Sequence, residues 1–274
     1  MMNDQHFQQI AQLAYEKCGI YLTEDKKSLL SNRLQFLVQS LGLKDFGEYH
    51  AWLRADTEGK RLQQFINQIT TNYSYFFREH EHFDYLMNHV LPQKKSRDIT
   101  EDTNDLHIWS AACSSGEEAY TLAMLLKEFL AKTTPRWDIG ILATDIDSEK
   151  LQEAHKGIYT GDRMKNVPPI YKTNYFQALD KTKWQVRPQL KQLIHFSNYN
   201  LIRPKFVFKS KFYAIFCRNV MIYFDRATIT ALVQRFYEVT EDYGFLFIGQ
   251  TENLDKDKCP YRYVAPAIYQ KIPR

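Results

Sequence analysis

The chain has 274 residues, which suits one large domain or two modest ones, and its 44% hydrophobic and 25% charged residues are typical of a globular protein with a sizeable core. The 15% of aromatic residues argues against extensive disorder, and no apolar run approaches the roughly 18 residues of a membrane-spanning helix. A formal net charge of +4 is too small to predict nucleic-acid binding, and polar side chains interrupt residues 1–19 too often for a secretory signal, so we expect a cytoplasmic protein.

The first part of the chain is predicted to be a bundle of helices. Apolar residues recur at helical spacing over 7–18, 30–41 and 62–69, so each stretch can bury one face. Asp45 followed by Glu48 resembles the capping box that opens a helix. These patterns indicate a small all-α domain.

From Leu106 onward, strand and helix patterns alternate. The predicted strands fall at 106–112, 139–145, 214–217, 245–249 and 261–272, and the predicted helices at 116–130, from about 148, and at 225–240. Strands separated by helices of this length predict an α/β fold with a mostly parallel sheet that is covered on both faces.

The domain organisation follows from these patterns. We expect a helical domain over 1–80, a linker over 81–104 and an α/β domain over 105–274. The polar stretch 93–104 is predicted to be a loop within the linker. Between 167 and 197 the alternation breaks into short segments rich in Tyr, Phe, Trp and Val, which indicate a small antiparallel β-subdomain inserted into the larger fold.

Two segments at the carboxyl edge of the predicted sheet favour a nucleotide-like ligand. The turn over 110–118 contains small residues that let a ligand approach the backbone, although this segment taken alone, with its single Gly, favours a tight capping turn. Asp145 ends the second strand, where a carboxylate can accept the hydrogens of both ribose hydroxyls, although an Asp there is commonly a helix cap. Asp147 is predicted to be the N-cap of the next helix.

The segment NYSYFFRE lies where the helical region meets the sheet region. Asn72 and Ser74 can supply polar contacts, and Arg78 supplies a fixed fork of donors that suits a carboxylate. A surface Arg78 paired with Glu79 or Glu81 is the alternative interpretation.

The segment FCRNVMIYF has a polar interruption between two apolar runs. Arg218 and Asn219 follow directly after a strand that is predicted to be buried. Because buried polar groups are costly unless they are hydrogen-bonded, this pair marks either a helix cap or a ligand site, and we favour the site.

Taken together, the chain resembles the CheR-type chemotaxis receptor glutamate methyltransferases over nearly its whole length. The resemblance is carried by NYSYFFRE, WSAACSSGEEAYTLA, ATDIDSEKLQEAHKGIY, SNYNL, FCRNVMIYF and YGFLFIGQTENL. It implies an N-terminal all-α helical domain, followed by a Rossmann-like class I S-adenosylmethionine-dependent methyltransferase domain with a small antiparallel β-subdomain insert. The implied activity transfers a methyl group from S-adenosylmethionine to glutamate carboxylates of receptor cytoplasmic domains in bacterial chemotaxis adaptation, which leaves S-adenosylhomocysteine and a glutamate methyl ester.

The resemblance also implies which residues form the site. The implied cofactor contacts are Asn72, Ser74, Arg78, Glu118, Asp145, Asn200, Leu201, Arg218 and Asn219. Arg78 and Tyr223 are the candidate catalytic residues, which would align the substrate carboxylate with the methyl donor. Arg78 can instead hold the carboxylate of the cofactor's methionine part, and both roles stay open.

The implied chemistry requires neither a catalytic base nor a metal. A glutamate side chain has an ordinary pKa of about 4.3, so it is an ionised nucleophile near pH 7. The four cysteines are far apart and form no Cys/His cluster, so we expect reduced thiols and no metal site. Two alternatives stay open: a class I methyltransferase that acts on nucleic acid or a small molecule, and a non-catalytic cofactor-sensing adaptor.

The implied partner is the cytoplasmic domain of methyl-accepting chemotaxis receptors, bound by a monomeric enzyme that takes no nucleic acid and meets the membrane only through the receptor. Residues 163–211 hold eleven basic side chains and one acidic side chain. Such a run is usually a solvated face, but it would also complement a receptor surface rich in glutamates. Because basic grooves track phosphates as well, this segment keeps the nucleic-acid alternative open.

Overall fold

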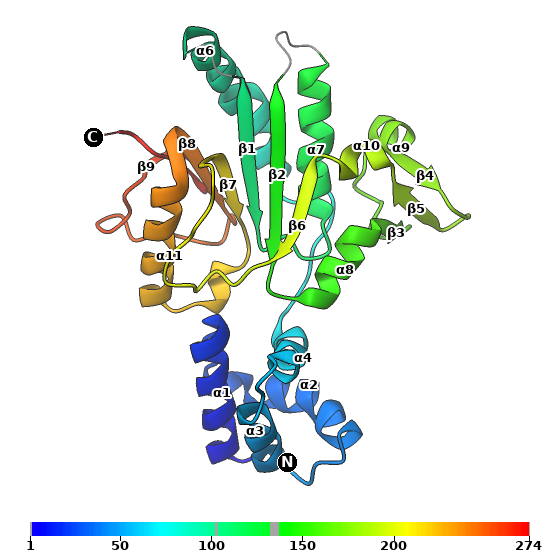
Figure 1. The fold of residues 1–274 in the computed structure, drawn as a ribbon, viewed down its shortest axis with the longest axis vertical. Helices are drawn as coiled ribbons and strands as arrows, with labels where there is room; N and C mark the ends of the chain where they lie inside the picture. Colours follow the sequence, from blue (N-terminus) through cyan, green and yellow to red (C-terminus); the bar gives the residue numbers. More distant parts are fainter. Residues whose placement is uncertain (1, 102–103, 132–136, 274) are drawn as a thin grey trace.

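The computed structural model describes residues 2–101, 104–131 and 137–273, and Figure 1 shows a helical bundle at one end of a sheet domain. The bundle contains α1 (Asp4–Cys18), the short η1 (Glu24–Lys26), α2 (Lys27–Ser40), α3 (Phe46–Arg54) and α4 (Lys60–Ile69). The apolar faces of these helices share one core, in which Ile10, Leu34 and Phe65 are fully buried. The helices predicted from apolar spacing are therefore confirmed.

Asp45 and Glu48 explain where α3 begins. The Asp45 carboxylate accepts hydrogen bonds from the backbone N–H groups of Gly47 and Glu48, at 2.8 and 2.9 Å. The Glu48 carboxylate reaches back to the N–H of Lys44 at 2.8 Å. Asp45 thus satisfies two donors that the helix start leaves open, as the capping pattern predicts, whereas Glu48 accepts from the residue before the N-cap rather than from the N-cap itself.

The predicted loop over 93–104 is wrong for residues 93–101, which are helical. The chain continues from α5 (His80–Tyr85) through a π-helical turn, η2 (Leu86–Val90), into α6 (Leu91–Glu101). Phe83 and the apolar side chains of η2 pack into the core of the sheet domain. Within the polar stretch, Lys94 and Asp98 form a buried ion pair at 2.8 Å, one helical turn apart. The polar composition of this stretch indicated a loop, because composition alone cannot show that Lys94 and Asp98 neutralise each other inside the protein.

The main sheet has seven strands in the order β6-β2-β1-β7-β8-β10-β9. Its strands are β1 (Asp105–Ala111), β2 (Asp138–Asp145), β6 (Ile194–Asn198), β7 (Phe212–Cys217), β8 (Thr240–Ile248), β9 (Arg262–Ala265) and β10 (Ile268–Gln270). The first five strands in this order run parallel, whereas β10 is antiparallel to both of its neighbours. The single strand predicted over 261–272 is therefore a hairpin, because the chain turns back at Pro266 and at Ala267, whose φ is 58°.

Helices cover both faces of the sheet, as the α/β pattern predicts. On one face, α7 (Glu117–Leu130) packs in a core together with η2 and the start of α6. On the other face, α11 (Arg226–Val239) packs on a second core that includes Trp109. The helix α8 (Ser148–Lys156) follows β2.

The inserted β-subdomain exists, but its predicted limits of 167–197 are shifted. Its antiparallel sheet has the order β3-β5-β4, with β3 (Ile158–Thr160), β4 (Phe176–Ala178) and β5 (Lys183–Val186), and it carries α9 (Pro169–Tyr175) and α10 (Pro188–Lys191). The segment LIHFS, predicted to belong to it, instead contributes β6 to the main sheet, parallel to β2. The segment VPPIYKTNYF is mostly the helix α9. Strands this short carry no sequence signal that tells which sheet they join.

The carboxyl ends of the parallel strands face the helical bundle, as the arrowheads of β1 and β2 in Figure 1 show. Several hydrogen bonds join the two parts. Among them, Gln63 Nε2 donates to the carbonyl of Ile146 at 2.7 Å, and the N–H of Tyr21 donates to the carbonyl of Tyr223 at 2.8 Å. Among the described helices, none combines the length and the apolar character needed to cross a bilayer.

Candidate active site

A pocket lies between the carboxyl edge of the sheet and the helical bundle, with about 1030 Å³ of empty space that includes its open mouth. It is lined by all ten residues that the sequence singled out, namely Asn72, Ser74, Arg78, Glu118, Asp145, Asn200, Leu201, Arg218, Asn219 and Tyr223. The helical bundle adds Cys18, Ile20 and Ile69 to the lining. The structure therefore brings together every predicted site residue, although their contacts with a ligand remain predictions.

The turn between β1 and α7 forms one wall of the pocket. Its backbone is left-handed at Ala112, Ser114 and Gly116, with φ values of 75°, 49° and 93°. A Cβ on Gly116 would lie only 2.9 Å from the Cβ of Ala154, so this position requires glycine on both conformational and steric grounds. The sharp turn lets the N–H of Ser114 donate to Asp145 Oδ2 at 2.7 Å. The small residues of this segment thus place backbone beside the acid at the end of β2.

Asp145 is buried at the carboxyl end of β2. Its Oδ2 accepts from Ser114, and its Oδ1 accepts from the N–H of Asp147 at 2.8 Å. Burial raises the pKa of Asp145 to about 6, although these backbone hydrogen bonds oppose the rise. Each oxygen retains a lone pair for a further donor. Nearby, the buried Ser114 Oγ lines the pocket and has no hydrogen-bond partner among the described residues. Both groups fit a ligand that carries hydroxyls.

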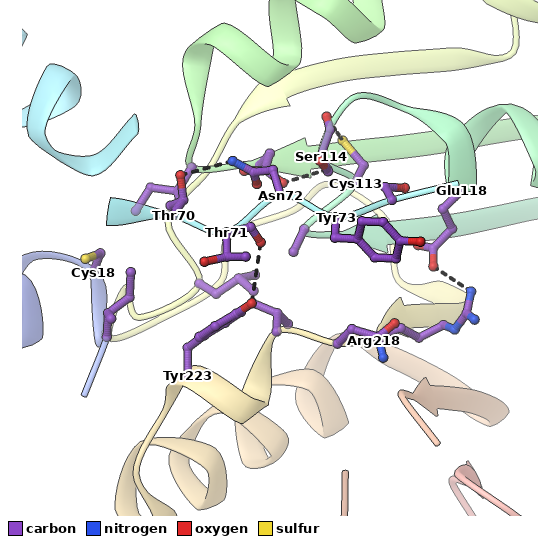
Figure 2. A pocket seen from close by; sticks show the side chains of 18 of the residues that line it. Cys18, Thr70, Thr71, Asn72, Tyr73, Cys113, Ser114, Glu118, Arg218 and Tyr223 are labelled. Carbon is purple, nitrogen blue, oxygen red and sulfur yellow. Dashed lines mark hydrogen bonds and ion pairs between the residues drawn. The ribbon is translucent and has the colours of Figure 1, made fainter. Parts of the chain in front are cut away.

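Arg218 and Glu118 form a charged pair at the pocket wall (Figure 2). Arg218 Nη1 lies 2.9 Å from Glu118 Oε2, and Glu118 Oε1 accepts from Ser110 Oγ at 2.6 Å. Burial raises the pKa of Glu118, and the Arg218 charge offsets only part of this rise. The second nitrogen of Arg218, Nη2, lies 3.1 Å from Glu79 Oε2. Glu79 is thus the partner of Arg218, a pairing that sequence reasoning missed when it considered Glu79 only beside Arg78.

Arg78 and Tyr223 both line the pocket. Arg78 Nη1 donates to the carbonyl of Tyr73 at 2.7 Å, and the guanidinium lies 5.7 and 5.9 Å from the ring centroids of Tyr73 and Tyr75. Tyr223 turns its hydroxyl toward the carbonyl of Thr71 at 3.5 Å, as Figure 2 shows. Both side chains are half-buried, so each can meet a substrate that enters from outside.

Asn72 and Asn200 use their amides to brace the pocket walls. Asn72 Nδ2 donates to Asp147 Oδ2 at 2.7 Å, and Asn200 Nδ2 donates to the carbonyl of Lys17 at 2.6 Å. Asp147 caps α8 through its other oxygen, which confirms the predicted N-cap. Its cross-link to Asn72 was missed, because the two residues are 75 positions apart.

Ser74 and Leu201 complete the predicted lining from two different segments. Leu201 is buried in the core on the α11 face, and Ser74 is half-buried. Neither adds a charge, so they shape the pocket rather than set its electrostatics.

The topology and this pocket define the class of the protein. With the main-sheet strands renumbered in chain order, the sheet runs 3-2-1-4-5-7-6 with an antiparallel seventh strand, and the acid that ends its second strand faces the pocket. This is the Rossmann-like arrangement of class I S-adenosylmethionine-dependent methyltransferases. Residues 5–70 match the family model described as "CheR methyltransferase, all-alpha domain", and residues 72–268 match "CheR methyltransferase, SAM binding domain". The chain belongs to the CheR methyltransferase family, and S-adenosylmethionine (SAM) is its cofactor.

Similar proteins support the same assignment. A chemotaxis protein methyltransferase of Borreliella burgdorferi is 41% identical over 96% of this chain and 92% of its own length. The chemotaxis protein methyltransferase of Escherichia coli is 38% identical over 92% of this chain and 85% of its own length. The predicted family, fold class, enzyme class and cofactor are thereby confirmed.

Proposed function

We propose that this methyltransferase transfers the methyl group of SAM to glutamate side-chain carboxylates in the cytoplasmic domains of chemotaxis receptors. Two of its relatives carry the name chemotaxis protein methyltransferase and align with nearly the whole chain. The observation that carries the proposal is the half-buried side chain of Arg78 in the lining of the cofactor pocket. Its planar fork matches a carboxylate that approaches from outside.

The residues that line the pocket fit the cofactor. Asp145 has lone pairs for two ribose hydroxyls, and the unpartnered Ser114 Oγ offers one further hydrogen bond. Glu118 and Arg218 would offer opposite charges to the amino and carboxylate groups of the cofactor. When bound, the cofactor supplies a methyl group that is already activated by its positively charged sulfur.

The substrate needs orientation rather than activation. A glutamate carboxylate is ionised near pH 7 and is already a nucleophile, so no residue has to remove a proton. Arg78 and Tyr223 would hold this carboxylate in line with the methyl group, while the helical bundle adds apolar lining to the pocket. Positioning of this kind can contribute roughly 7–11 kcal/mol to lowering a barrier.

A labelling experiment tests the proposal. With SAM labelled on the methyl group and a receptor cytoplasmic fragment, we expect label on the receptor that is released by mild base, because carboxyl methyl esters hydrolyse readily. A base-stable label would indicate a different acceptor, such as nucleic acid or a small molecule added in its place. Binding of SAM with no transfer to any acceptor would favour the cofactor-sensing adaptor.

The basic segment 163–211 divides into anchored and exposed charges. Lys172 stacks on Trp184 at 3.6 Å, and Lys191 donates to the carbonyls of His155 and Lys156. In contrast, Lys181, in the turn before β5 of the subdomain, and Lys183, the first residue of β5, are both exposed. We propose that these two lysines speed the encounter with an anionic receptor surface.

Reversing both charges, in Lys181→Glu with Lys183→Glu, is expected to raise the KM for receptor about tenfold at low salt. The effect should shrink near physiological salt, where charges farther apart than about 8 Å are screened. The Kd for SAM should stay unchanged, because neither lysine lines the pocket. The matched control reverses Lys256 and Lys258, which are exposed in the segment after β8. If the double reversal leaves the KM for receptor unchanged at low salt, the basic segment 163–211 is only a solvated face.

A further inference from the structure

The carboxylate of Glu79 connects its own segment to the ends of two strands of the main sheet. Glu79 lies outside the described pocket lining, yet its carboxylate accepts from Arg218 Nη2 at 3.1 Å and from Asn219 Nδ2 at 3.0 Å. It also accepts from the N–H of Gln250 at 3.3 Å. Arg218 and Asn219 follow β7, and Gln250 follows β8. One side chain thus fastens the ends of two neighbouring strands to the segment that carries Arg78.

The backbone around Glu79 is bent to make these contacts. Phe77 and Glu79 are both left-handed, with φ values of 58° and 53°. Non-glycine residues hold this conformation only where the surrounding structure enforces it. The bend directs the Arg78 side chain to Tyr73 and Tyr75, whereas the Glu79 side chain reaches Arg218. Arg218 Nη2 also donates to the carbonyl of Arg78, so the backbone of Arg78 is held by the same contact.

The charge of Glu79 is needed by Arg218. The Arg218 side chain is 2% exposed, and its fork lies between Glu118 and Glu79. Burial raises the pKa of Glu79, but the Asn219 hydrogen bond and the Arg218 charge outweigh it, so the pKa lies below its usual value. His82 lies 3.5 Å from Glu79, but burial lowers the pKa of His82 to about 4. The histidine is therefore neutral near pH 7, and the guanidinium alone balances the carboxylate.

We infer that Glu79 is a positioning residue for cofactor binding: it holds Arg218 and Asn219 in the pocket wall and fixes the backbone of Arg78 without touching the cofactor. This inference rests on the cofactor contacts proposed above for Arg218 and Asn219. It adds a residue that the pocket lining itself does not reveal.

The variant Glu79→Gln tests this role. Three groups donate to the Glu79 carboxylate: the guanidinium of Arg218, the side-chain amide of Asn219 and the backbone N–H of Gln250. A Gln side chain has only one oxygen that can accept, and its NH₂ would face at least one of these donors, so it cannot satisfy all three. We expect calorimetry to show SAM binding at least about tenfold weaker than in the wild-type protein. The wild-type measurement tests the cofactor site itself, and the ratio of variant to wild type tests Glu79. Neither measurement depends on the identity of the methyl acceptor.

A matched control separates positioning from general stability. Glu241 is a partly buried carboxylate at the amino end of β8, 3.6 Å from Lys94 Nζ and away from the pocket. Glu241→Gln is expected to lower the Tm while leaving the SAM affinity unchanged. If both variants weaken SAM binding to the same extent, Glu79 is a structural residue and the inference is overturned.

A coupling measurement shows whether Glu79 acts through Asn219. Asn219 has a φ of 59°, so Asn219→Gly removes the amide and keeps the backbone permitted. Adding Glu79→Gln to this variant should weaken binding by a smaller factor than in the wild-type protein, since one of its contacts is already gone. Fully multiplicative effects would contradict the role. If Glu79→Gln does not fold, Glu79→Asp applies, because its shorter side chain cannot reach Arg218 and Asn219 together. Wild-type affinity in a folded Glu79→Asp variant would overturn the inference.

Discussion

Replacing Asp145 with asparagine is expected to weaken SAM binding at least about tenfold, since each hydrogen bond to a charged group contributes roughly 1.5–3 kcal/mol. The amide also has to place its NH₂ against the N–H of Ser114 or Asp147, both of which donate to the carboxylate. Calorimetry on the folded variant measures the loss. Asp138→Asn, at the exposed amino end of the same strand, is the control and should bind normally. Unchanged affinity in Asp145→Asn would remove this residue from the cofactor site.

The same carboxylate predicts how SAM binding depends on pH. In the free protein the pKa of Asp145 is raised to about 6 by burial. Ribose hydroxyls donate to the ionised form, so cofactor binding lowers this pKa and releases a proton when it occurs below pH 6. Affinity should therefore be constant well above pH 6 and fall by about tenfold per pH unit below it, until the pKa of the complex is reached. Asp145→Asn should lack this dependence, and an identical pH profile in both proteins would contradict the assignment.

The elements that sequence could predict are those whose own residues determine them. The helix α1 buries apolar residues at helical spacing, and the strand β1 is a short and almost continuously buried run, so the local sequence locates both. The helix α6 was missed because its stability comes from the buried pair Lys94–Asp98 and from packing on the sheet. The strand β6 was placed in the wrong sheet, because its partner β2 is about fifty positions away. In both α6 and β6, contacts with distant parts of the chain determine the structure.

The candidate site also contains residues that the local sequence could predict and residues that depend on distant partners. Long segments that resemble one family located ten residues, and the structure gathers all of them in one pocket. Glu79 and the cross-link of Asp147 were missed because each depends on a partner far along the chain. Arg218, for example, lies 139 positions after Glu79. No local pattern in the sequence specifies such pairings. In contrast, the order of the parallel strands is enough to bring the predicted residues at the ends of these strands to the same edge of the sheet.

The neighbours of Arg78 determine what its side chain can do. Its hydrogen bond to the Tyr73 carbonyl uses one N–H of the fork, and the rings of Tyr73 and Tyr75 restrict the guanidinium. The guanidinium makes no other hydrogen bond with the described residues, so its remaining N–H groups can bind a carboxylate in two parallel hydrogen bonds. Two carboxylates compete for this role, the substrate glutamate and the methionine end of the cofactor, and the two possibilities predict different kinetics.

If Arg78 orients the substrate, Arg78→Ala should lower kcat roughly 100-fold, since small misplacements in the transition state cost about this much, while the Kd for SAM changes little. Arg78→Lys should not restore turnover, because an ammonium cannot reproduce the planar fork. Tyr223→Phe should lower kcat less, since it keeps the ring that packs against the helical bundle and loses only the hydroxyl. Methylation rates on a receptor fragment and calorimetry with SAM separate these effects. A large rise in the SAM Kd of Arg78→Ala would instead assign Arg78 to the cofactor carboxylate, and near-normal turnover in Arg78→Lys would exclude the orienting role.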